Sequence, residues 1–206
     1  PVVDSQRIAP KPVLQALHRL MDGQKGIVTT GVGCHQHWAA RHLSFAPDQW
    51  RLLTSAGHGT MGYDIPTAVG AAMACPGSPV LCVVGDGSLL MNIQELASIS
   101  ERRLPIKVLV LNNARLGIVS QFQKITWNDD PTTGHFPSPD FAAIARGFGI
   151  EAEQVDHSDA LDAALVRFWQ SSGPRLLDVR IDPQADVVPM LLGGQTMDQM
   201  WQGYPR

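Results

Sequence analysis

Short apolar runs alternate along this chain with segments whose apolar residues recur at helical spacing. The two clearest runs cover residues 79–84 and 106–111, are rich in Val, Leu and Ile, and are bounded by turn residues. Between them, the apolar positions predict a helix over residues 89–102. A strand–helix–strand crossover is right-handed and places its two strands parallel, so both strands end at the same edge of a sheet.

The same pattern extends over most of the chain. Further strands are predicted over residues 26–30, 51–55, 151–155 and 176–181. Further helices are predicted over residues 13–21, 65–75, 114–122, 141–148 and 160–169, with another helical pattern running through His42. This alternation predicts an α/β fold in three layers, a mostly parallel open sheet with helices on both faces. Residues 126–139 are predicted to form a mobile active-site loop, and residues 182–206 a C-terminal arm.

Polar and glycine-rich turns follow the predicted strands. Gly85-Asp86-Gly87-Ser88 follows one central strand, and Asn112-Asn113 follows the next. Because ligands of open parallel sheets bind outside the carboxyl ends of the strands, these turns are expected to meet at a ligand. The Asp86 carboxylate and the Asn113 amide oxygen are groups that Mg²⁺ prefers. An aspartate repels a phosphate unless a cation lies between them, so the two turns together predict a metal-bridged diphosphate. The tripeptide alone is more typical of a simple helix cap, and the second oxygen-bearing turn favours the metal site.

Two other glycine turns raise the alternative of a nicotinamide dinucleotide. Residues 57–62 satisfy the G-x-G-x-x-G fingerprint between a predicted strand and a helix, whereas residues 31–36 carry only its first two glycines. No strand with an acidic residue follows residues 57–62 at the distance expected for a ribose ligand. An NAD-dependent dehydrogenase is therefore the weaker alternative. A non-catalytic assembly domain is a third hypothesis, but an idle site has no physical need for both Asp86 and Asn113.

Composition restricts the class of protein. The 206 residues suffice for one domain core, and no segment resembles an interdomain linker. The net charge of −3 and the lack of a Lys/Arg cluster disfavour nucleic acid and anionic membranes as partners. Three cysteines without disulfide spacing suit a reducing compartment, so a cytoplasmic location is expected. The sequence predicts no membrane span or signal peptide, and its start at Pro1 suggests a piece of a longer protein.

Three side chains beside the turns are candidates for contact with a ligand. His35 is placed to hydrogen-bond a phosphate, although the default interpretation of an isolated histidine is structural. Met61 is either a core filler or an apolar wedge under a folded cofactor. Cys34 has no nearby base in the sequence, so it is not interpreted as a nucleophile. None of the glutamates is an evident catalytic acid.

Several of these motifs resemble those of one enzyme family. Gly85-Asp86-Gly87, followed after 24 residues by Asn112-Asn113, is similar to the thiamine-diphosphate signature. The segments that resemble the large subunit of acetolactate (acetohydroxyacid) synthase are residues 32–38, 54–63, 85–92, 112–117 and 188–194. The resemblance covers nearly the whole chain but only the C-terminal, diphosphate-binding third of such enzymes. The pyrimidine-binding and central domains are therefore expected to lie outside this chain.

The resemblance implies thiamine diphosphate and Mg²⁺ as cofactors. Mg²⁺ would be held by Asp86, Asn113 and the backbone carbonyl of Arg115. The residues implied to contact the cofactor are Val32, Gly33, Cys34, His35, Gly59, Met61, Asp86, Gly87, Ser88, Asn113, Leu116, Gly117 and Ile118.

The resemblance also implies a role for each part of this set. His35, the amides of residues 87–88 and residues 116–118 would meet the diphosphate. Met61 would be the wedge that forces the cofactor into a V shape. Phe122 stands where the biosynthetic synthases have a Trp that shapes the acceptor pocket, so Phe122 is assigned to the substrate pocket. Cys34 stands where these synthases usually have Gln, and both departures bear on the choice of substrate.

The activity implied by the resemblance is decarboxylation of a small 2-keto acid and condensation of the enamine with a second carbonyl compound, as in branched-chain amino acid biosynthesis. The catalytic glutamate would come from the pyrimidine-binding domain of a second subunit, within a homodimer or homotetramer. No catalytic residue is thus expected in this chain, which should be inactive alone. FAD would bind only in the absent domains. The alternative within this cofactor class is another 2-keto-acid decarboxylase or oxidase.

Overall fold

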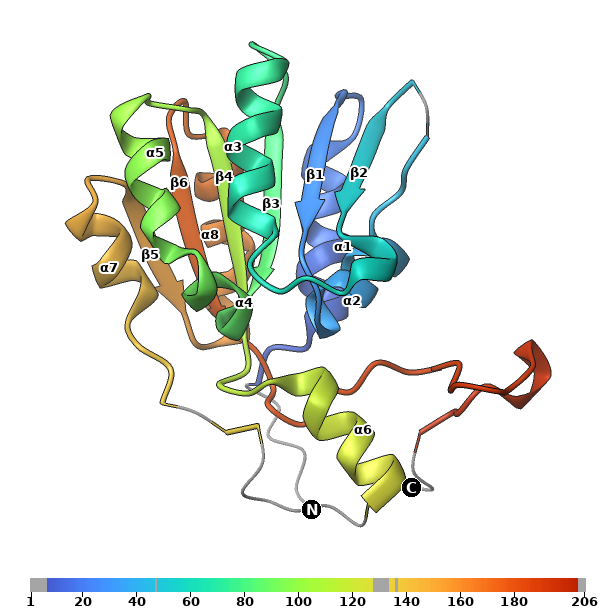
Figure 1. Ribbon diagram of the computed structural model, residues 1–206. Coiled ribbons are helices and arrows are strands. Elements are labelled where there is room, and N and C mark those ends of the chain that lie inside the picture. Colours follow the sequence, from blue (N-terminus) through green and yellow to red (C-terminus); the bar gives the residue numbers. More distant parts are fainter. Residues whose placement is uncertain (1–6, 47, 128–133, 136, 204–206) are drawn as a thin grey trace.

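A six-stranded parallel sheet forms the centre of the protein (Figure 1). The computed structural model describes residues 7–46, 48–127, 134–135 and 137–203. The strands lie in the order β2-β1-β3-β4-β6-β5, and all of these pairings are parallel. Their bounds are β1 Gly26–Thr30, β2 Trp50–Thr54, β3 Val80–Gly85, β4 Ile106–Asn112, β5 Glu151–Val155 and β6 Arg175–Arg180. The predicted α/β class is confirmed, and the sheet is parallel throughout rather than mostly so.

Helices cover both faces of the sheet, as the alternating pattern predicts. Their bounds are α1 Pro10–Met21, α2 Cys34–His42, α3 Asp64–Ala74, α4 Asp86–Met91, α5 Leu96–Glu101, α6 Gly117–Trp127, α7 Phe141–Gly147 and α8 Ser158–Gln170, with short 3₁₀ turns η1 Ala56–His58, η2 Ile93–Glu95 and η3 Met197–Gln199. None of the helices in the described ranges is both long and apolar enough to cross a membrane.

Two hydrophobic cores lie on opposite faces of the sheet. Side chains alternate across a strand, so Leu81 and Val83 of β3 join α1, α2 and α8 in one core. Cys82 and Val84 of the same strand join α3, α5 and α7 in the other. Every residue of β3 and β4 is buried, which explains why these strands read in the sequence as continuous apolar runs.

The helix predicted over residues 89–102 is wrong in detail. It begins three residues earlier, as α4, and is interrupted at Asn92, whose backbone has φ −139° and ψ 36°. The Asn92 side chain donates a hydrogen bond of 2.8 Å to the carbonyl of Gly62, so it is committed to another segment. An asparagine side chain often hydrogen-bonds to nearby backbone groups in competition with the helix. Here its partner, Gly62, is distant in the sequence, and this contact accompanies the end of α4 at Asn92.

The segment after β4 also differs from the prediction. The helix expected over residues 114–122 is α6, which begins at Gly117 because Ala114 adopts a positive φ of 53°. The Leu116 amide donates to the Gly134 carbonyl at 2.7 Å instead of entering the helix. The predicted loop over residues 126–139 starts inside α6, and its residues 128–133 and 136 lie outside the described residues.

Residues 182–203 of the C-terminal arm and α6 project together beyond the carboxyl edge of the sheet (Figure 1). The Gln121 side chain of α6 donates to the Val187 carbonyl at 2.9 Å and accepts from the Val187 amide at 2.7 Å. Arg41 of α2 donates to the Pro189 carbonyl. The arm is therefore anchored to α2 and α6, two of the helices that begin at this edge.

Candidate functional site

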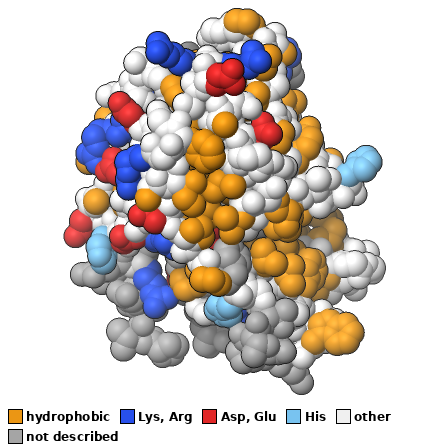
Figure 2. All heavy atoms as spheres, turned by 60° about the vertical axis from the view of Figure 1, so that its left-hand side comes forward, with side chains coloured by type: hydrophobic (Ala, Val, Ile, Leu, Met, Phe, Trp, Pro, Cys, Tyr) orange, Lys and Arg blue, Asp and Glu red, His pale blue; other side chains and the backbone are white. Residues whose placement is uncertain are grey.

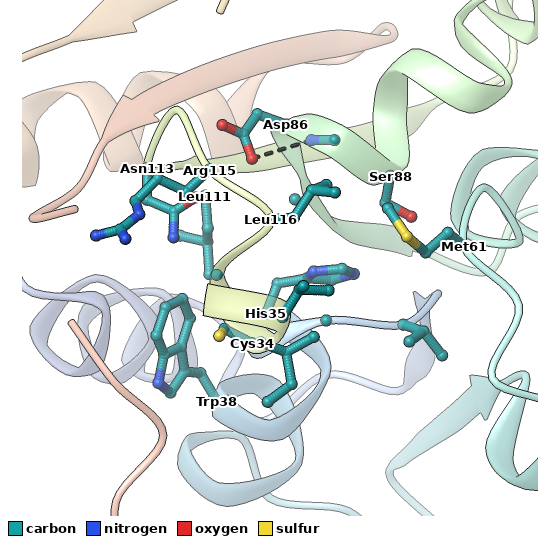
Figure 3. Close-up of a pocket in the computed structure, with 17 residues that line it drawn as sticks. Cys34, His35, Trp38, Met61, Asp86, Ser88, Leu111, Asn113, Arg115 and Leu116 are labelled. Carbon is teal, nitrogen blue, oxygen red and sulfur yellow. Dashed lines mark hydrogen bonds between the residues drawn. The ribbon is translucent and has the colours of Figure 1, made fainter. Parts of the chain in front are cut away.

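One pocket lies at the carboxyl ends of β1, β3 and β4 (Figure 3). It contains about 400 Å³ of empty space, part of it open to solvent. Its lining residues are Val32, Gly33, Cys34, His35, Trp38, Met61, Gly85, Asp86, Gly87, Ser88, Leu111, Asn113, Arg115, Leu116, Gly117, Ile118 and Val119. The turns after three neighbouring strands thus meet where a parallel sheet is expected to bind its ligand.

The structure brings together all but one of the residues that the family resemblance implies for cofactor contact. The exception is Gly59, which ends η1 at a φ of 62°, is exposed, and does not line the pocket. Phe122, assigned to the substrate pocket, also lies outside this pocket and is exposed on α6. Four lining residues were not predicted as contacts: Trp38, Gly85, Leu111 and Val119. Gly85 and Val119 lie next to predicted residues, Trp38 lies one helical turn from Cys34, and Leu111 lies two residues before Asn113. Closeness in the sequence was the available signal.

Asp86 is the buried acid at the centre of the site. It is 2% exposed, and its Oδ1 accepts a hydrogen bond of 3.0 Å from the Gly87 amide. Its Oδ2 is buried without a partner among the described residues. Burial raises the pKa of Asp86 to about 6, against the opposing effect of the Gly87, Ala114 and Arg115 amides. A buried oxygen of this kind is destabilising unless a cation or a proton joins it.

Asn113 and Arg115 face the same pocket from the turn after β4. Both are nearly buried, and the Arg115 guanidinium is directed to the Pro183 carbonyl, to which its Nη1 donates at 3.2 Å. A Cβ at Gly117 would lie 2.7 Å from Nδ2 of Asn113 and 3.0 Å from Sγ of Cys34. Glycine is thus required for α6 to begin directly against these two side chains.

The described residues contain no group of three His, Cys, Asp or Glu side chains that could hold a metal ion. A cation at this pocket would therefore take one carboxylate, from Asp86, together with the neutral oxygens of the β4 turn. Such a donor set suits a hard ion such as Mg²⁺, which keeps waters and phosphate oxygens among its ligands. The orphaned Asp86 oxygen and the neighbouring Asn113 amide fit this requirement.

A second buried acid, Asp64, was missed by the sequence interpretation. It is fully buried at the first residue of α3, and it accepts hydrogen bonds from the Gly31 amide and the Ser88 hydroxyl. Its Oδ1 also lies 2.9 Å from Nε2 of His35. His35 was predicted to meet a phosphate, and in the structure one edge of its ring is joined to this carboxylate. Nothing in the spacing of residues 31, 35, 64 and 88 indicates that they meet.

Asp64 also bears on the dinucleotide hypothesis. A dinucleotide would place its pyrophosphate at the start of the helix that follows the glycine fingerprint. Here that helix is α3, and its first residue is the buried Asp64 carboxylate. The pKa of Asp64 is lowered because His35, the Ser88 hydroxyl and the Gly31 amide together outweigh its burial. A buried negative charge at the first residue of α3 disfavours a pyrophosphate at the start of that helix, which argues against a dinucleotide site at residues 57–62.

Cys34 and Met61 border the pocket on different sides. Cys34 is buried, and burial is the main reason that the pKa of its thiol is raised to about 12. A raised pKa favours the neutral thiol at neutral pH, which disfavours a role for Cys34 as a nucleophile. Met61 is half-buried and lies on the same side of the pocket as Ser88 (Figure 3). It is thus a lining residue rather than part of either core.

Comparison with known proteins gives a family and several relatives. Residues 31–179 match the family described as "Thiamine pyrophosphate enzyme, C-terminal TPP binding domain". "Acetolactate synthase 2, chloroplastic" of Zea mays is 42% identical over 205 residues, covering 95% of this chain and 32% of the relative. "Acetolactate synthase isozyme 2 large subunit" of Escherichia coli is 41% identical over a match that covers 84% of this chain and 32% of the relative. "Acetolactate synthase catalytic subunit, mitochondrial" of Saccharomyces cerevisiae is 39% identical over a match that covers 94% of this chain and 28% of the relative.

The chain spans about a third of the length of these curated relatives, whereas the family match covers most of the chain. The pocket, with its Gly85-Asp86-Gly87 turn, lies within the matched residues. The resemblance expected from the sequence is confirmed. The chain belongs to the thiamine pyrophosphate enzyme family, and residues 31–179 are its C-terminal TPP-binding domain.

Proposed function

We propose that this chain is the part of an acetolactate-synthase-like enzyme that binds the diphosphate of thiamine diphosphate through Mg²⁺. One observation carries the proposal: the unpartnered, buried oxygen of Asp86 lies in a pocket that also contains Asn113. A carboxylate in this position is explained by a bound cation, and a cation is what allows an anionic diphosphate beside it. The identity of about 40% to acetolactate synthases over most of the chain supports the assignment.

Within this proposal, Oδ2 of Asp86, the side-chain oxygen of Asn113 and the backbone carbonyl of Arg115 would hold Mg²⁺. The ion would supply the positive charge that the buried carboxylate and a diphosphate both need. The Ala114 backbone, in its positive-φ conformation, turns the chain between Asn113 and Arg115 so that both line the pocket. Glycines at 85 and 87 keep the backbone on both sides of Asp86 open to the ligand.

The cofactor supplies an electron sink that allows a 2-keto acid to lose carbon dioxide. The residues of this chain bind and orient it. His35, the amides of residues 87–88 and residues 116–118 bind the diphosphate in the proposal, and Met61 supports the apolar body. Trp38 and Leu111 add apolar walls that exclude water from the charged groups and thereby strengthen their interactions.

The proposal requires a second domain for turnover. None of the pocket-lining residues is a glutamate, so the group that activates the aminopyrimidine is assigned to the pyrimidine-binding domain of a partner subunit. Large apolar side chains are available for such a contact, including Met73 of α3 and Met91 of α4, each at least half exposed. Figure 2 shows that hydrophobic side chains gather near the centre of one face. A cytoplasmic homodimer or homotetramer remains part of the proposal, with any FAD bound in other domains.

The test is calorimetric titration of the chain with thiamine diphosphate in Mg²⁺ and again in EDTA. The proposal predicts binding that is at least about tenfold tighter in Mg²⁺. Thiamine, which lacks the diphosphate, should bind far more weakly under both conditions, and NAD should not bind. Equal affinity for thiamine and thiamine diphosphate, or affinity unaffected by EDTA, would contradict the proposal.

A further inference from the structure

Asp64 joins two of the segments that surround the pocket. Its side chain accepts from Gly31 and lies within hydrogen-bonding distance of His35 in the turn and helix that follow β1. It also accepts from the Ser88 hydroxyl of α4, which follows β3. Its backbone carbonyl accepts from Oγ1 of Thr29 at 3.1 Å, so the residue itself is held in place. Asp64 does not line the pocket, although both His35 and Ser88 do.

The two buried acids near the pocket differ in how many of their carboxylate oxygens have hydrogen-bond partners. Asp86 has an oxygen without a partner, whereas both oxygens of Asp64 are occupied. The pKa of Asp86 is raised by burial, and the pKa of Asp64 is lowered by its hydrogen bonds and by His35. Asp64 therefore has no oxygen left for a metal ion, but it carries a charge that can orient its neighbours.

The position of the His35 ring follows from this contact. Nε2 of the ring faces Asp64, so the other ring nitrogen, Nδ1, lies against the backbone of Gly33 and Gly85, which both line the pocket. A Cβ added at Gly33 would lie 2.9 Å from Nδ1, and a Cβ added at Gly85 would lie 2.8 Å from it. Side chains at either position would displace the ring. In Figure 3 the ring lies across the pocket from Asp86. Nδ1 is thus the His35 atom that remains for a ligand next to the Gly85-Asp86-Gly87 turn.

Ser88 is fixed by the same carboxylate. Its hydroxyl hydrogen is donated to Asp64, and its oxygen accepts from the Gly62 amide at 2.8 Å. The Ser88 hydroxyl consequently has no hydrogen left to donate to a phosphate. Asp64 therefore determines which donors of His35 and Ser88 are available in the pocket.

We propose that Asp64 is a positioning residue for the diphosphate: it holds the His35 ring by Nε2 so that Nδ1 donates a hydrogen bond to a phosphate oxygen. This inference rests on the proposed function, because it takes the pocket's ligand to be a diphosphate. An anionic oxygen requires a hydrogen on Nδ1, while Asp64 requires one on Nε2, so the bound ring is an imidazolium. The negative charge of Asp64 balances that positive charge, which makes both hydrogen bonds charge-assisted.

The first test measures affinity for magnesium pyrophosphate by calorimetry, which probes the diphosphate alone. The variants are Asp64→Asn, which keeps the size and one acceptor but removes the charge, His35→Gln, and the two together. We expect each single substitution to weaken binding at least about tenfold. The double variant should bind about as weakly as His35→Gln alone, because Asp64 acts through His35. Asp159→Asn, which removes an exposed acid from the first turn of α8, is the matched control and should bind like wild type.

The second test observes the His35 ring directly by NMR of the chain with ¹⁵N-labelled histidine. Bound to magnesium pyrophosphate, the wild-type ring should carry hydrogens on both nitrogens, and the Asp64→Asn ring on one. A role of Asp64 in folding alone would change the stability but not the number of ring hydrogens. The wild-type measurement decides the question even if Asp64→Asn does not fold.

Three results would overturn the inference: wild-type affinity in Asp64→Asn, additive losses in the double variant, or a bound wild-type ring without a hydrogen on Nδ1. In each of these cases wild type still binds magnesium pyrophosphate, so the proposed function survives. If wild type does not bind magnesium pyrophosphate, the proposed function fails and the inference fails with it.

Discussion

The two aspartates near the pocket show how the surroundings of a single residue determine its role. Asp64 meets the Gly31, His35 and Ser88 donors and is stable as an anion, whereas Asp86 keeps one buried oxygen unpaired. Because the uncharged form of Asp86 is favoured in the folded chain, the cofactor-free protein is destabilised once Asp86 ionises. The cost of burying this carboxylate is offset only when a cation binds.

This cost gives a prediction for pH dependence. In the unfolded chain Asp86 ionises near the ordinary aspartate pKa of 3.8, and in the folded chain near 6, so the folded state binds more protons between these values. Stability from this group is therefore lost as pH rises from about 4 to 6, by roughly 2–3 kcal/mol. Without Mg²⁺, Asp86→Asn should resemble wild type near pH 4 and be more stable at pH 7, as measured by urea unfolding. A difference between the two proteins that does not change with pH would contradict the assignment.

At the scale of elements, the central strands and the surrounding helices could be predicted from the sequence. Strands β3 and β4 are buried on both faces, so burial alone imposes their apolar runs, and the turns after them carry the site. The break at Asn92 could not be predicted, because its hydrogen bond is to Gly62, which lies in a different turn. The link from Asp64 to His35 and Ser88 is likewise tertiary, and no local spacing indicates it.

The start of α6 gives a prediction about glycine. In Gly117→Ala the new Cβ would displace Asn113, because its Nδ2 lies 2.7 Å away. The Asn113 side chain can rotate, so we expect a loss of only about 1 kcal/mol in stability. Affinity for thiamine diphosphate in Mg²⁺ should fall at least about tenfold, because a proposed ligand of Mg²⁺ has moved. Calorimetry and urea unfolding measure the two effects separately.

Gly70→Ala is the matched control, since Gly70 lies within α3 and a Cβ there meets nothing within 4 Å. It should bind the cofactor like wild type and be more stable by roughly 0.5–1 kcal/mol, the difference in helix propensity. If Gly117→Ala also binds like wild type, Asn113 is not a ligand of Mg²⁺ in the proposed site.

At the scale of the whole molecule, the described residues form a six-stranded sheet with its pocket, and the chain spans about a third of the length of its relatives. The pocket supplies oxygen ligands, glycine turns and apolar walls, but no glutamate lines it. The proposed enzyme therefore divides its work: this domain anchors the diphosphate, and a second domain activates the cofactor. Exposed apolar side chains such as Met91 and Trp127 are consistent with contacts to further protein.

This division predicts that the chain alone binds the cofactor but does not turn over. With thiamine diphosphate, Mg²⁺ and pyruvate, we expect no release of carbon dioxide above the rate of the free cofactor. The measurement is continuous detection of carbon dioxide at saturating cofactor. Sustained turnover by the isolated chain would show that its own residues activate the cofactor and would contradict the assignment of that role to a partner.

The central claim is that the unpaired oxygen of Asp86 holds the Mg²⁺ that bridges to the diphosphate. The most direct test compares the affinity of wild type, Asp86→Asn and Asp159→Asn for thiamine diphosphate, each with Mg²⁺ and with EDTA. We predict that Mg²⁺ strengthens binding at least about tenfold in wild type and in the Asp159→Asn control, and has almost no effect in Asp86→Asn. If Asp86→Asn keeps the full effect of Mg²⁺, Asp86 is not the metal ligand and the proposed metal-bridged binding at this pocket is wrong.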